Sequence, residues 1–389
     1  MAHSTTGGTT AKPAKPRPDF PLFPHATRRW AKKIRGKLHY FGPWDDPEAA
    51  LQKYLAERED LYAGRTPREA SGGLTVRDLC NHFLTGKQRE ARAGEISLRT
   101  FRDYYGTCAR VVECFGKTRL VIDLTAQDFG QLRDMMAKTL GPASRKTEIQ
   151  KTKAIFNYAC NLDLIDRLVR FGPDFRAPSA RVLKKARRQN GAKMFSAEEI
   201  RAMLDAASTQ MKAMILLGIN AGYGNNDLGS LPLSALDLER GWVEHARPKT
   251  GVDRRCPLWA ETIDALKAVI ASRPKPKDPA DADLVFVKPK GRPWVRLDSD
   301  GRWTDDLGPA AIRLLRRLGL HRPGRTFYAL RHGFETIAGE SLDQVSVNTI
   351  MGHTDQSMAA VYRERISDER LRNVVEHVRK WLFETKETK

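Results

Sequence analysis

Apolar side chains recur at helical spacing along most of the chain and at strand-like spacing near its beginning. Between residues 30 and 44, aromatic or apolar residues alternate with basic ones around Gly36 and Gly42, which predicts a short antiparallel hairpin. Helical spacing over residues 47–62 adds one helix to this hairpin. Farther along, the same spacing predicts a four-helix domain, with helices at 74–83, at 97–115, from 124 onward and at 144–162.

Three stretches interrupt these patterns. Residues 1–20 are rich in Thr, Gly, Ala, Lys and Pro, which predicts a disordered basic tail. Residues 64–73 predict a short linker. Residues 176–193 are basic with few apolar groups, so we expect an extended linker suited to lying along phosphates. Ser196 and Glu199 have the spacing of a capping box, which predicts the start of a further domain. The expected partition is therefore a tail at 1–20, domains at 21–64, 74–175 and 194–366, a linker at 176–193, and a C-terminal helix and tail at 367–389.

The composition points to an anionic partner. A chain of 389 residues suits two or three domains, and 41% hydrophobic residues provide enough material for folded cores. The formal net charge of +20 is spread along the whole chain, which favours nucleic acid as the partner; a basic but inert surface is the alternative. The candidate DNA contacts are basic side chains on the hairpin, on two helices and in the linker: Lys32, Lys33, Arg35, Lys37, Arg99, Arg102, Arg145, Lys146, Lys184, Lys185, Arg187 and Arg188.

Several other classes of protein are disfavoured. The five cysteines are odd in number and form no CxxC pair, which argues against a disulfide framework or a zinc site and fits a reducing cytoplasm. No run of about 18 apolar residues predicts a membrane span, and the beginning of the sequence lacks the apolar core of a signal peptide. With no Walker loop and no acidic metal cluster, we expect neither a cofactor nor a metal.

Three segments of the last domain have a characteristic order and spacing. They read TFYALRHGF at 326–334, IMGHT at 350–354 and VYR at 361–363. This arrangement resembles the tyrosine recombinase (phage integrase) family, in which an arginine on a helix is followed by a Gly-His pair and then by the nucleophilic tyrosine. The resemblance implies that Arg331, His353 and Tyr362 are catalytic.

A fourth segment extends the resemblance. RPKTG at 247–251 leads into RRCPL at 254–258, which is similar to the family's β-hairpin lysine and makes Lys249 the catalytic lysine. The stretch 231–238 looks like the family's entry into that small sheet. The resemblance covers nearly everything after residue 20. It implies a multidomain fold, mainly α with small β-sheets: an N-terminal ββ(β)α arm-type DNA-binding module, a helical core-DNA-binding domain and a mixed α/β catalytic domain.

The sequence departs from the family at two positions. Gly224 stands where the first arginine belongs, and Asp227 replaces the glutamate that follows it, where we expect it to brace the turn. Tyr328 replaces a histidine three residues before Arg331, and we count it among the catalytic residues because its hydroxyl can donate one hydrogen bond to a phosphate. The candidate substitutes for the missing arginine are Asn225 and Asn226, or a basic residue from elsewhere such as Arg254 or Arg255.

By this resemblance, the chain is a site-specific recombinase that cleaves and rejoins double-stranded DNA through a 3′-phosphotyrosyl intermediate at Tyr362. It would be a monomer when free and a homotetramer on synapsed DNA, in the cytoplasm and associated with a nucleoid, in a prokaryotic or mobile-element context. Because Gly224 removes a phosphate-binding side chain, a DNA-binding accessory protein that has lost cleavage is the alternative. A topoisomerase-like enzyme is a third hypothesis, but the arm-like module argues against it.

Two further expectations concern packing. Trp242, Trp259 and Phe286 are most simply core residues. A helical stripe after Tyr362 predicts a C-terminal helix that packs either on its own domain or on a neighbouring protomer; the stripe comprises Leu371, Val374, Val375, Val378, Trp381 and Leu382.

Overall fold

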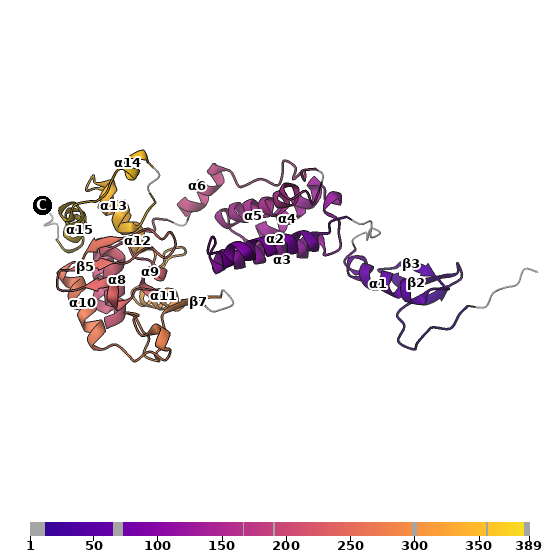
Figure 1. Ribbon diagram of the computed structural model, residues 1–389, viewed down its shortest axis with the longest axis horizontal. Helices are drawn as coiled ribbons and strands as arrows, with labels where there is room; N and C mark the ends of the chain where they lie inside the picture. Colours follow the sequence, from indigo (N-terminus) through magenta and orange to yellow (C-terminus); the bar gives the residue numbers. More distant parts are fainter. Residues whose placement is uncertain are drawn as a thin grey trace, which may run out of the picture. The chain divides into compact units, whose positions relative to one another are not determined.

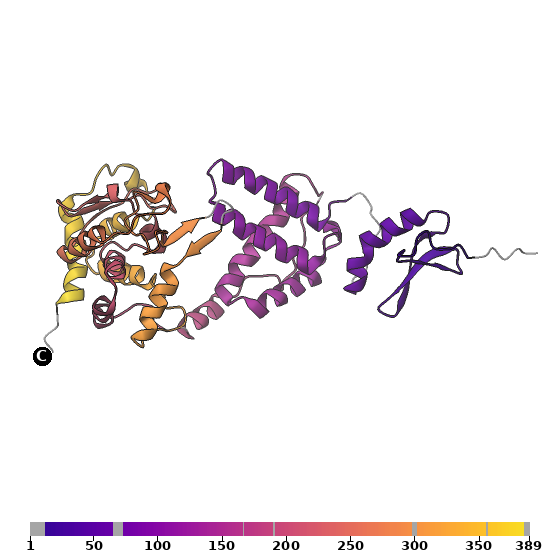
Figure 2. The same cartoon turned by 90° about the horizontal axis from the view of Figure 1, so that it is seen from below.

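The computed structural model describes residues 12–64, 73–165, 167–189, 191–297, 302–354 and 357–384. The chain divides into two compact units, Met1–Leu183 and Lys184–Lys389, and each is described by itself. Helices dominate both units, and the three β-sheets are small, as the sequence predicted (Figures 1 and 2). Two separate hydrophobic cores lie in the first unit and one larger core in the second.

The first core belongs to a three-stranded antiparallel sheet covered by one helix. Strands β1 (Phe23–His25), β2 (Arg29–Ile34) and β3 (Lys37–Pro43) lie in that order, and α1 (Pro47–Tyr62) packs on β3. The predicted hairpin is thus confirmed, with one additional strand. Its tight turn consists of Arg35 and Gly36, both at positive φ (49° and 82°), which is the geometry that joins twisted strands with a two-residue loop.

The predicted disordered tail is too long at its C-terminal end. Phe20 is only 2% exposed and lies edge-on to Trp30 in the core of the sheet module. Lys15 also donates a hydrogen bond to the Phe20 carbonyl, so order begins before residue 20. Residues 1–11, and most of the predicted linker at 64–73, lie outside the described residues.

The second core is the predicted four-helix domain, which comprises α2 (Val76–Arg92), α3 (Leu98–Phe115), α4 (Ala126–Thr139) and α5 (Pro142–Asn161). Short polar residues cap the first three helices. The side chains of Thr75 and Ser97 accept the N–H groups of Asp78 and Thr100, and at the third helix the Asp128 carboxylate accepts from the N–H and the hydroxyl of Thr125. A cluster of aromatic rings around Phe129 fills the interior.

The predicted extended linker is wrong over its central part. Residues Ala180–Gln189 form helix α6, none of whose residues is buried. Its sequence, ARVLKKARRQ, is composed almost entirely of good helix formers, and long basic side chains lose little rotamer freedom in a helix. Few apolar groups therefore indicated solvent exposure here but did not indicate an extended backbone.

The second unit is built around one buried helix. In α8 (Thr209–Asn220) every residue from 213 to 220 is buried, and α7 (Ala197–Ala206), α10 (Ala260–Ala271) and α12 (Ala329–Gly339) pack against it. The predicted capping box at Ser196 and Glu199 is present at the start of α7. This unit also contains α9 (Asn225–Gly229), α11 (Leu307–Arg317), α13 (Gln344–Met351) and α14 (Met358–Val361).

Two small antiparallel sheets border this core. One has the order β4 (Leu236–Asp237), β5 (Trp242–Glu244) and β6 (Arg255–Pro257), and the other pairs β7 (Val295–Leu297) with β8 (Trp303–Asp305). Asn220, fully buried at the end of α8, donates to the carbonyl of Pro257 and accepts from Trp259 N–H and Thr262 Oγ. These bonds fix the end of β6, and with it the hairpin β5–β6, to the central helix.

The C-terminal helix α15 (Asp368–Phe383) packs on its own domain. Leu371, Val374, Val375, Val378 and Leu382 are buried, while Trp381 is partly buried. The Trp259 indole donates to the carbonyl of Val375, and Arg379 bonds Glu261 through two nitrogens at 2.7 and 3.1 Å. Trp242, Trp259 and Phe286 are buried in the same core, as predicted. Among the described residues, no helix is long and apolar enough to cross a membrane.

Candidate active site

Arg331 lies in the first turn of α12 and is only 3% exposed. Its neighbours Leu330 and Phe334 are fully buried and fix the helix on α8. The guanidinium donates to the carbonyls of Gly222 (2.5 Å) and Met351 (2.8 Å), and Nη2 lies 3.1 Å from His353 Nε2. Burial, reinforced by the nearby Arg247, lowers the pKa of Arg331. Arg331 and His353 therefore lie within hydrogen-bonding distance of each other.

The end of helix α13 positions the side chain of His353. Gly352 has a left-handed conformation (φ 63°), which ends the helix, and the N–H of His353 donates to the carbonyl of Asn348. The Nδ1 atom lies 3.8 Å from Glu335 Oε2. Because arginine only donates, Nε2 accepts from Arg331 and the neutral ring carries its proton on Nδ1. Burial lowers the pKa of His353, which favours the neutral ring.

Lys249 lies in the turn that joins β5 to β6, and its side chain is exposed. Both ends of this turn are anchored on the Gly-His segment. The Gly352 carbonyl accepts from Arg247 Nη1 (3.2 Å) and from Thr250 Oγ1 (3.4 Å). These two bonds join the hairpin of Lys249 to the segment that positions His353, although about a hundred residues separate them in sequence.

Gly224 opens helix α9, and its N–H donates to Asp227 Oδ2 (2.7 Å). Asp227 therefore braces this turn, as expected. A Cβ at residue 224 would lie 3.1 Å from Cε2 and 3.2 Å from Cδ2 of Tyr328. The ring of Tyr328, itself 43% exposed, thus covers the position from which an arginine side chain would leave. The two departures from the family pattern lie against each other in space.

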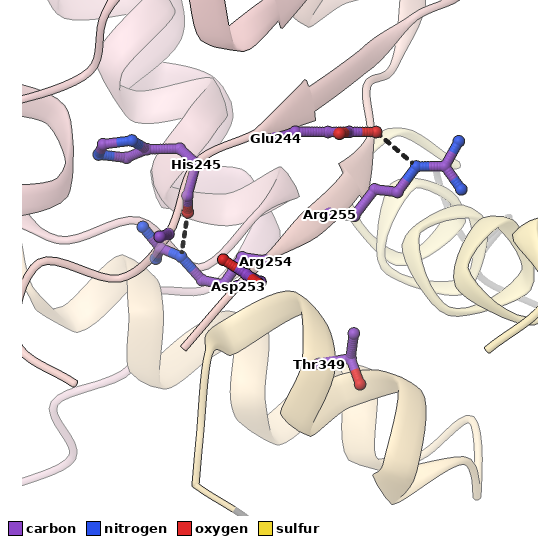
Figure 3. A pocket seen from close by; sticks show the side chains of 7 residues that line it. Glu244, His245, Asp253, Arg254, Arg255 and Thr349 are labelled. Carbon is purple, nitrogen blue, oxygen red and sulfur yellow. Dashed lines mark hydrogen bonds and ion pairs between the residues drawn. The ribbon is translucent and has the colours of Figure 1, made fainter. Parts of the chain in front are cut away.

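The candidate substitutes differ in their surroundings. The Asn225 amide donates to Asp305 of β8 (2.6 Å), which turns it toward that strand, and the backbone carbonyl of Asn226 accepts from Ser230. Arg255 bonds Glu244 and Asp368, and its guanidinium lies 3.8 Å from the centre of the Trp242 ring. Figure 3 shows Arg254 and Arg255 on opposite sides of the hairpin, which is the alternation of a strand.

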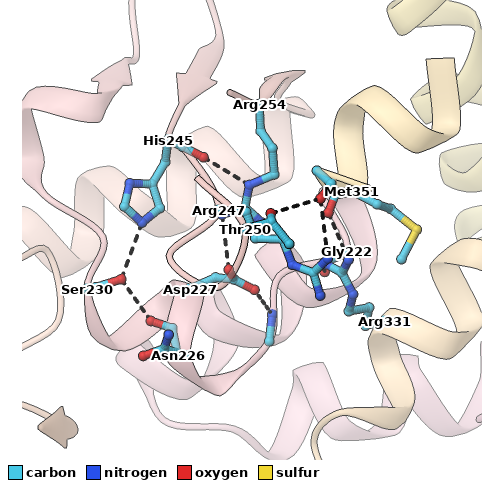
Figure 4. A network of polar contacts seen from close by, with 12 residues as sticks. Gly222, Asn226, Asp227, Ser230, His245, Arg247, Thr250, Arg254, Arg331 and Met351 are labelled. Atoms are coloured by element: carbon cyan, nitrogen blue, oxygen red, sulfur yellow. Dashed lines mark hydrogen bonds and ion pairs between the residues drawn. The ribbon is translucent and has the colours of Figure 1, made fainter. Parts of the chain in front are cut away.

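Arg254 is buried, with 1% of its side chain exposed, and forms an ion pair with Asp227 (3.1 Å). Its Nε donates to the carbonyl of His245, and its guanidinium lies 4.3 Å from the centre of the Tyr223 ring. Figure 4 shows the side chains of Arg254, Asp227, Arg247 and Arg331 gathered between the hairpin and α13. Sequence reasoning named Arg254 only as a nearby base and missed Arg247 as a site residue.

Tyr362 directly follows the short helix α14, and its side chain is 79% exposed. Ser357 caps this helix by accepting from the Ala360 N–H. An exposed hydroxyl on a short element suits a group that has to reach a bound polymer. Among the described residues, no set of three His, Cys, Asp or Glu side chains is arranged to hold a metal ion.

Most of the basic side chains predicted to contact DNA are exposed. On the sheet module, Lys33, Arg35 and Lys37 are exposed, while Lys32 is half-buried with its ammonium 5.2 Å from the centre of the Tyr54 ring. Of those on the four-helix domain, only Arg145 is half-buried. The exposed positions on that domain and on α6 are Arg99, Arg102, Lys146, Lys184, Lys185, Arg187 and Arg188.

The second unit matches a known protein family over most of its length. Residues 193–368 match the sequence profile of the phage integrase family. The match includes all of Arg331, His353, Lys249 and Tyr362. No curated protein gave a significant sequence match.

Solved structures of integrases have the same fold. The Tn1549 transposon integrase in complex with transposon right end DNA is 18% identical, with a TM-score of 0.58 over 79% of this chain and 100% of that one. A lambda integrase dimer bound to a COC′ core site is 17% identical, with a TM-score of 0.55 over 92% and 98% of the two chains. A lambda integrase tetramer bound to a Holliday junction is 15% identical, with a TM-score of 0.54 over 90% and 98%.

Proposed function

We propose that this chain is a site-specific DNA recombinase that cleaves and rejoins DNA strands through Tyr362. The observation that carries the proposal is the position of Arg331. Its guanidinium is buried beside the neutral ring of His353 and bonded to the Gly222 and Met351 carbonyls, inside a domain that matches the phage integrase family. When a nucleophile attacks a phosphodiester, negative charge grows on the non-bridging oxygens, and a fixed guanidinium stabilises it. A proton acceptor beside it can take the proton of the nucleophile.

The chemistry uses side chains alone. The Tyr362 oxygen attacks the phosphorus while the bond from phosphorus to the 5′ oxygen breaks. The tyrosine proton passes to His353 Nε2, which Arg331 frees when its guanidinium donates to the phosphate instead. Lys249 gives a proton to that leaving oxygen. Arg331 donates to the non-bridging oxygens throughout. The product is a 3′-phosphotyrosyl bond and a 5′ hydroxyl. Since the new bond conserves the energy of the old one, attack by another 5′ hydroxyl reverses the steps on a new strand.

The basic surfaces serve to hold the DNA. The sheet module at 21–64 would act as an arm-type DNA-binding module and the domain at 74–175 as a core-DNA-binding domain, with α6 lying along phosphates between it and the catalytic domain at 194–366. With a net charge of +20, such contacts are favourable for any duplex. The lambda integrase tetramer on a Holliday junction supports the proposal that four copies of this chain join two DNA sites.

The test is covalent trapping. The full chain first selects duplexes from random DNA, and each selected duplex is nicked near a candidate cleavage point. After cleavage, the short fragment that carries the new 5′ hydroxyl diffuses away, so the strand cannot be rejoined. We expect an SDS-stable protein–DNA adduct with the wild type and none with Tyr362→Phe, which lacks only the attacking oxygen. An adduct that survives in Tyr362→Phe would refute the role of this tyrosine.

The second candidate is a DNA-binding accessory protein without cleavage. Gly224 favours it, since loss of one transition-state donor commonly costs about 10²–10³ in rate. This alternative predicts tight, salt-sensitive binding and no adduct on any bound duplex. The same experiment therefore separates the two functions.

A further inference from the structure

Arg247 and Arg331 hold neighbouring places in the site. Arg331 Nη2 donates to the Met351 carbonyl (2.8 Å), and Arg247 Nη1 donates to the carbonyl of the next residue, Gly352 (3.2 Å). Two guanidiniums bonded to consecutive carbonyls bring like charges together, which is why Arg247 contributes to lowering the pKa of both Arg331 and His353. Figure 4 shows both side chains converging on this short segment.

The positive charge here is not balanced. Asp227 is engaged by Arg254 and by the Gly224 N–H, and Glu335 faces His353. Among the described residues, neither Arg247 nor Arg331 has a carboxylate within ion-pair distance. Three arginines against Asp227 and Glu335 leave a surplus of one positive charge in a partly buried cluster. Such a surplus is costly unless an anion binds there.

Arg254 provides an independent sign. Its Nη1 atom is buried without a hydrogen-bond acceptor, whereas Nη2 lies 3.1 Å from Asp227 Oδ1 in the ion pair. Buried donors without acceptors are rare in folded proteins, and one explanation is an ion that completes the site. Arg254 is engaged by Asp227 and by the His245 carbonyl, whereas Arg247 is partly exposed and donates one hydrogen bond, to the Gly352 carbonyl.

We infer that Arg247 supplies the second phosphate-binding guanidinium, in place of the one that Gly224 lacks. Arg254 is then a positioning residue that neutralises Asp227. The inference rests on the proposed cleavage function and names a further catalytic residue for it. Arg247 approaches the phosphate from the hairpin that also carries Lys249. An arginine at residue 224 would approach it from the start of α9.

The ring of Tyr328 crowds the position of residue 224, which favours a phosphate-binding arginine on another element. A Cβ at residue 224 would lie 3.1 Å from the ring of Tyr328, so an arginine there requires that ring to shift. From the hairpin, Arg247 donates to a non-bridging oxygen of the scissile phosphate while Arg331 donates to the other. Two cations on one phosphate offset its charge and stabilise the additional charge of the transition state.

The experiment compares single-turnover cleavage of two suicide duplexes by the full chain. One has an ordinary phosphate at the cleaved position. The other has a methylphosphonate there, in which a methyl group replaces one non-bridging oxygen and removes the negative charge. The variants are Arg247→Gln and Arg247→Lys. Arg255→Gln is the matched control, because it removes a guanidinium from the same hairpin on the side that faces Glu244 and Asp368.

On the phosphate we expect Arg247→Gln to cleave about 10²–10³-fold more slowly than the wild type, with Arg247→Lys in between. On the methylphosphonate the loss should shrink to less than about tenfold, because no charge remains to be offset. Arg255→Gln should match the wild type on both. If Arg247→Gln lost the same factor in cleavage rate on both duplexes, or lost none, the role of Arg247 would be overturned, while the proposed function would stand. A wild type that forms no adduct on any duplex it binds would overturn the proposed function and the inference with it.

Discussion

The ion pair between Asp227 and Arg254 should be the costliest one to break in the C-terminal unit. Their side chains are 10% and 1% exposed, and Arg254 Nη2 lies 3.1 Å from Asp227 Oδ1. Two unit charges at that distance attract by about 5 kcal/mol at an effective dielectric constant of about 20. Measured losses on removing one partner of a buried pair are about 3–5 kcal/mol, because the other charge is left buried and unpaired.

Asp227→Asn isolates this charge. An asparagine keeps the volume and an oxygen that accepts the Gly224 N–H, so only the charge is removed. We expect the free energy of unfolding to fall by about 3–5 kcal/mol. The control Arg255→Gln breaks pairs whose side chains are 39–64% exposed, and it should cost less than about 1 kcal/mol.

The double variant Asp227→Asn with Arg254→Met removes both charges and keeps an apolar stem beside Gly352. It should be more stable than the sum of the single changes predicts, by about 2–3 kcal/mol. Urea unfolding followed by tryptophan fluorescence suits this cycle, since five of the seven tryptophans lie in the second unit. A cost below about 1 kcal/mol for Asp227→Asn, or strictly additive losses, would refute this account of the buried pair.

Three further predictions follow from the site and its approaches. Burial lowers the pKa of His353, so cleavage should stay constant as the pH falls to 6.5 and decline only below it; Glu335→Gln should move this decline to still lower pH, and a decline above 6.5 would contradict the assignment. Gly224→Arg should cleave faster when Tyr328→His is added, because the shorter ring relieves the crowding at 224; equal rates in the suicide assay would exclude that crowding as the obstacle. Changing the basic residues of α6 to Gln should reduce the slope of log K against log salt by about 0.9 for each phosphate that the helix no longer neutralises, and an unchanged slope would place α6 away from DNA.

Short motifs allowed the sequence to single out the segments that carry Arg331 and His353. Arg331 and His353 are within hydrogen-bonding distance because a helix start and a Gly-ended helix each have a local signature. Helix caps at Thr75 and Ser196 were predictable for the same reason, since a cap involves residues only three positions apart. Interactions between residues that are close in sequence can therefore be predicted from a single sequence.

Arg247 was not predictable, because its role depends on a hydrogen bond to Gly352 that only the folded chain creates. The place of Tyr328 over Gly224 is likewise a tertiary arrangement of two separate departures from the family pattern. For α15, the stripe showed that one face would be buried but not against what; the partner proved to be its own domain, through Trp259. The extended linker was wrong for a different reason, because low hydrophobicity was interpreted as absence of a helix in α6.

The central claim, that Tyr362 attacks a DNA phosphate, is tested most directly by the chemical identity of the adduct. The trapped protein would be digested with nuclease and protease, and the peptide that carries the nucleotide sequenced by mass spectrometry. We predict a nucleotide joined through its 3′ phosphate to Tyr362. A nucleotide on any other residue, or one attached through a 5′ phosphate, would contradict the account.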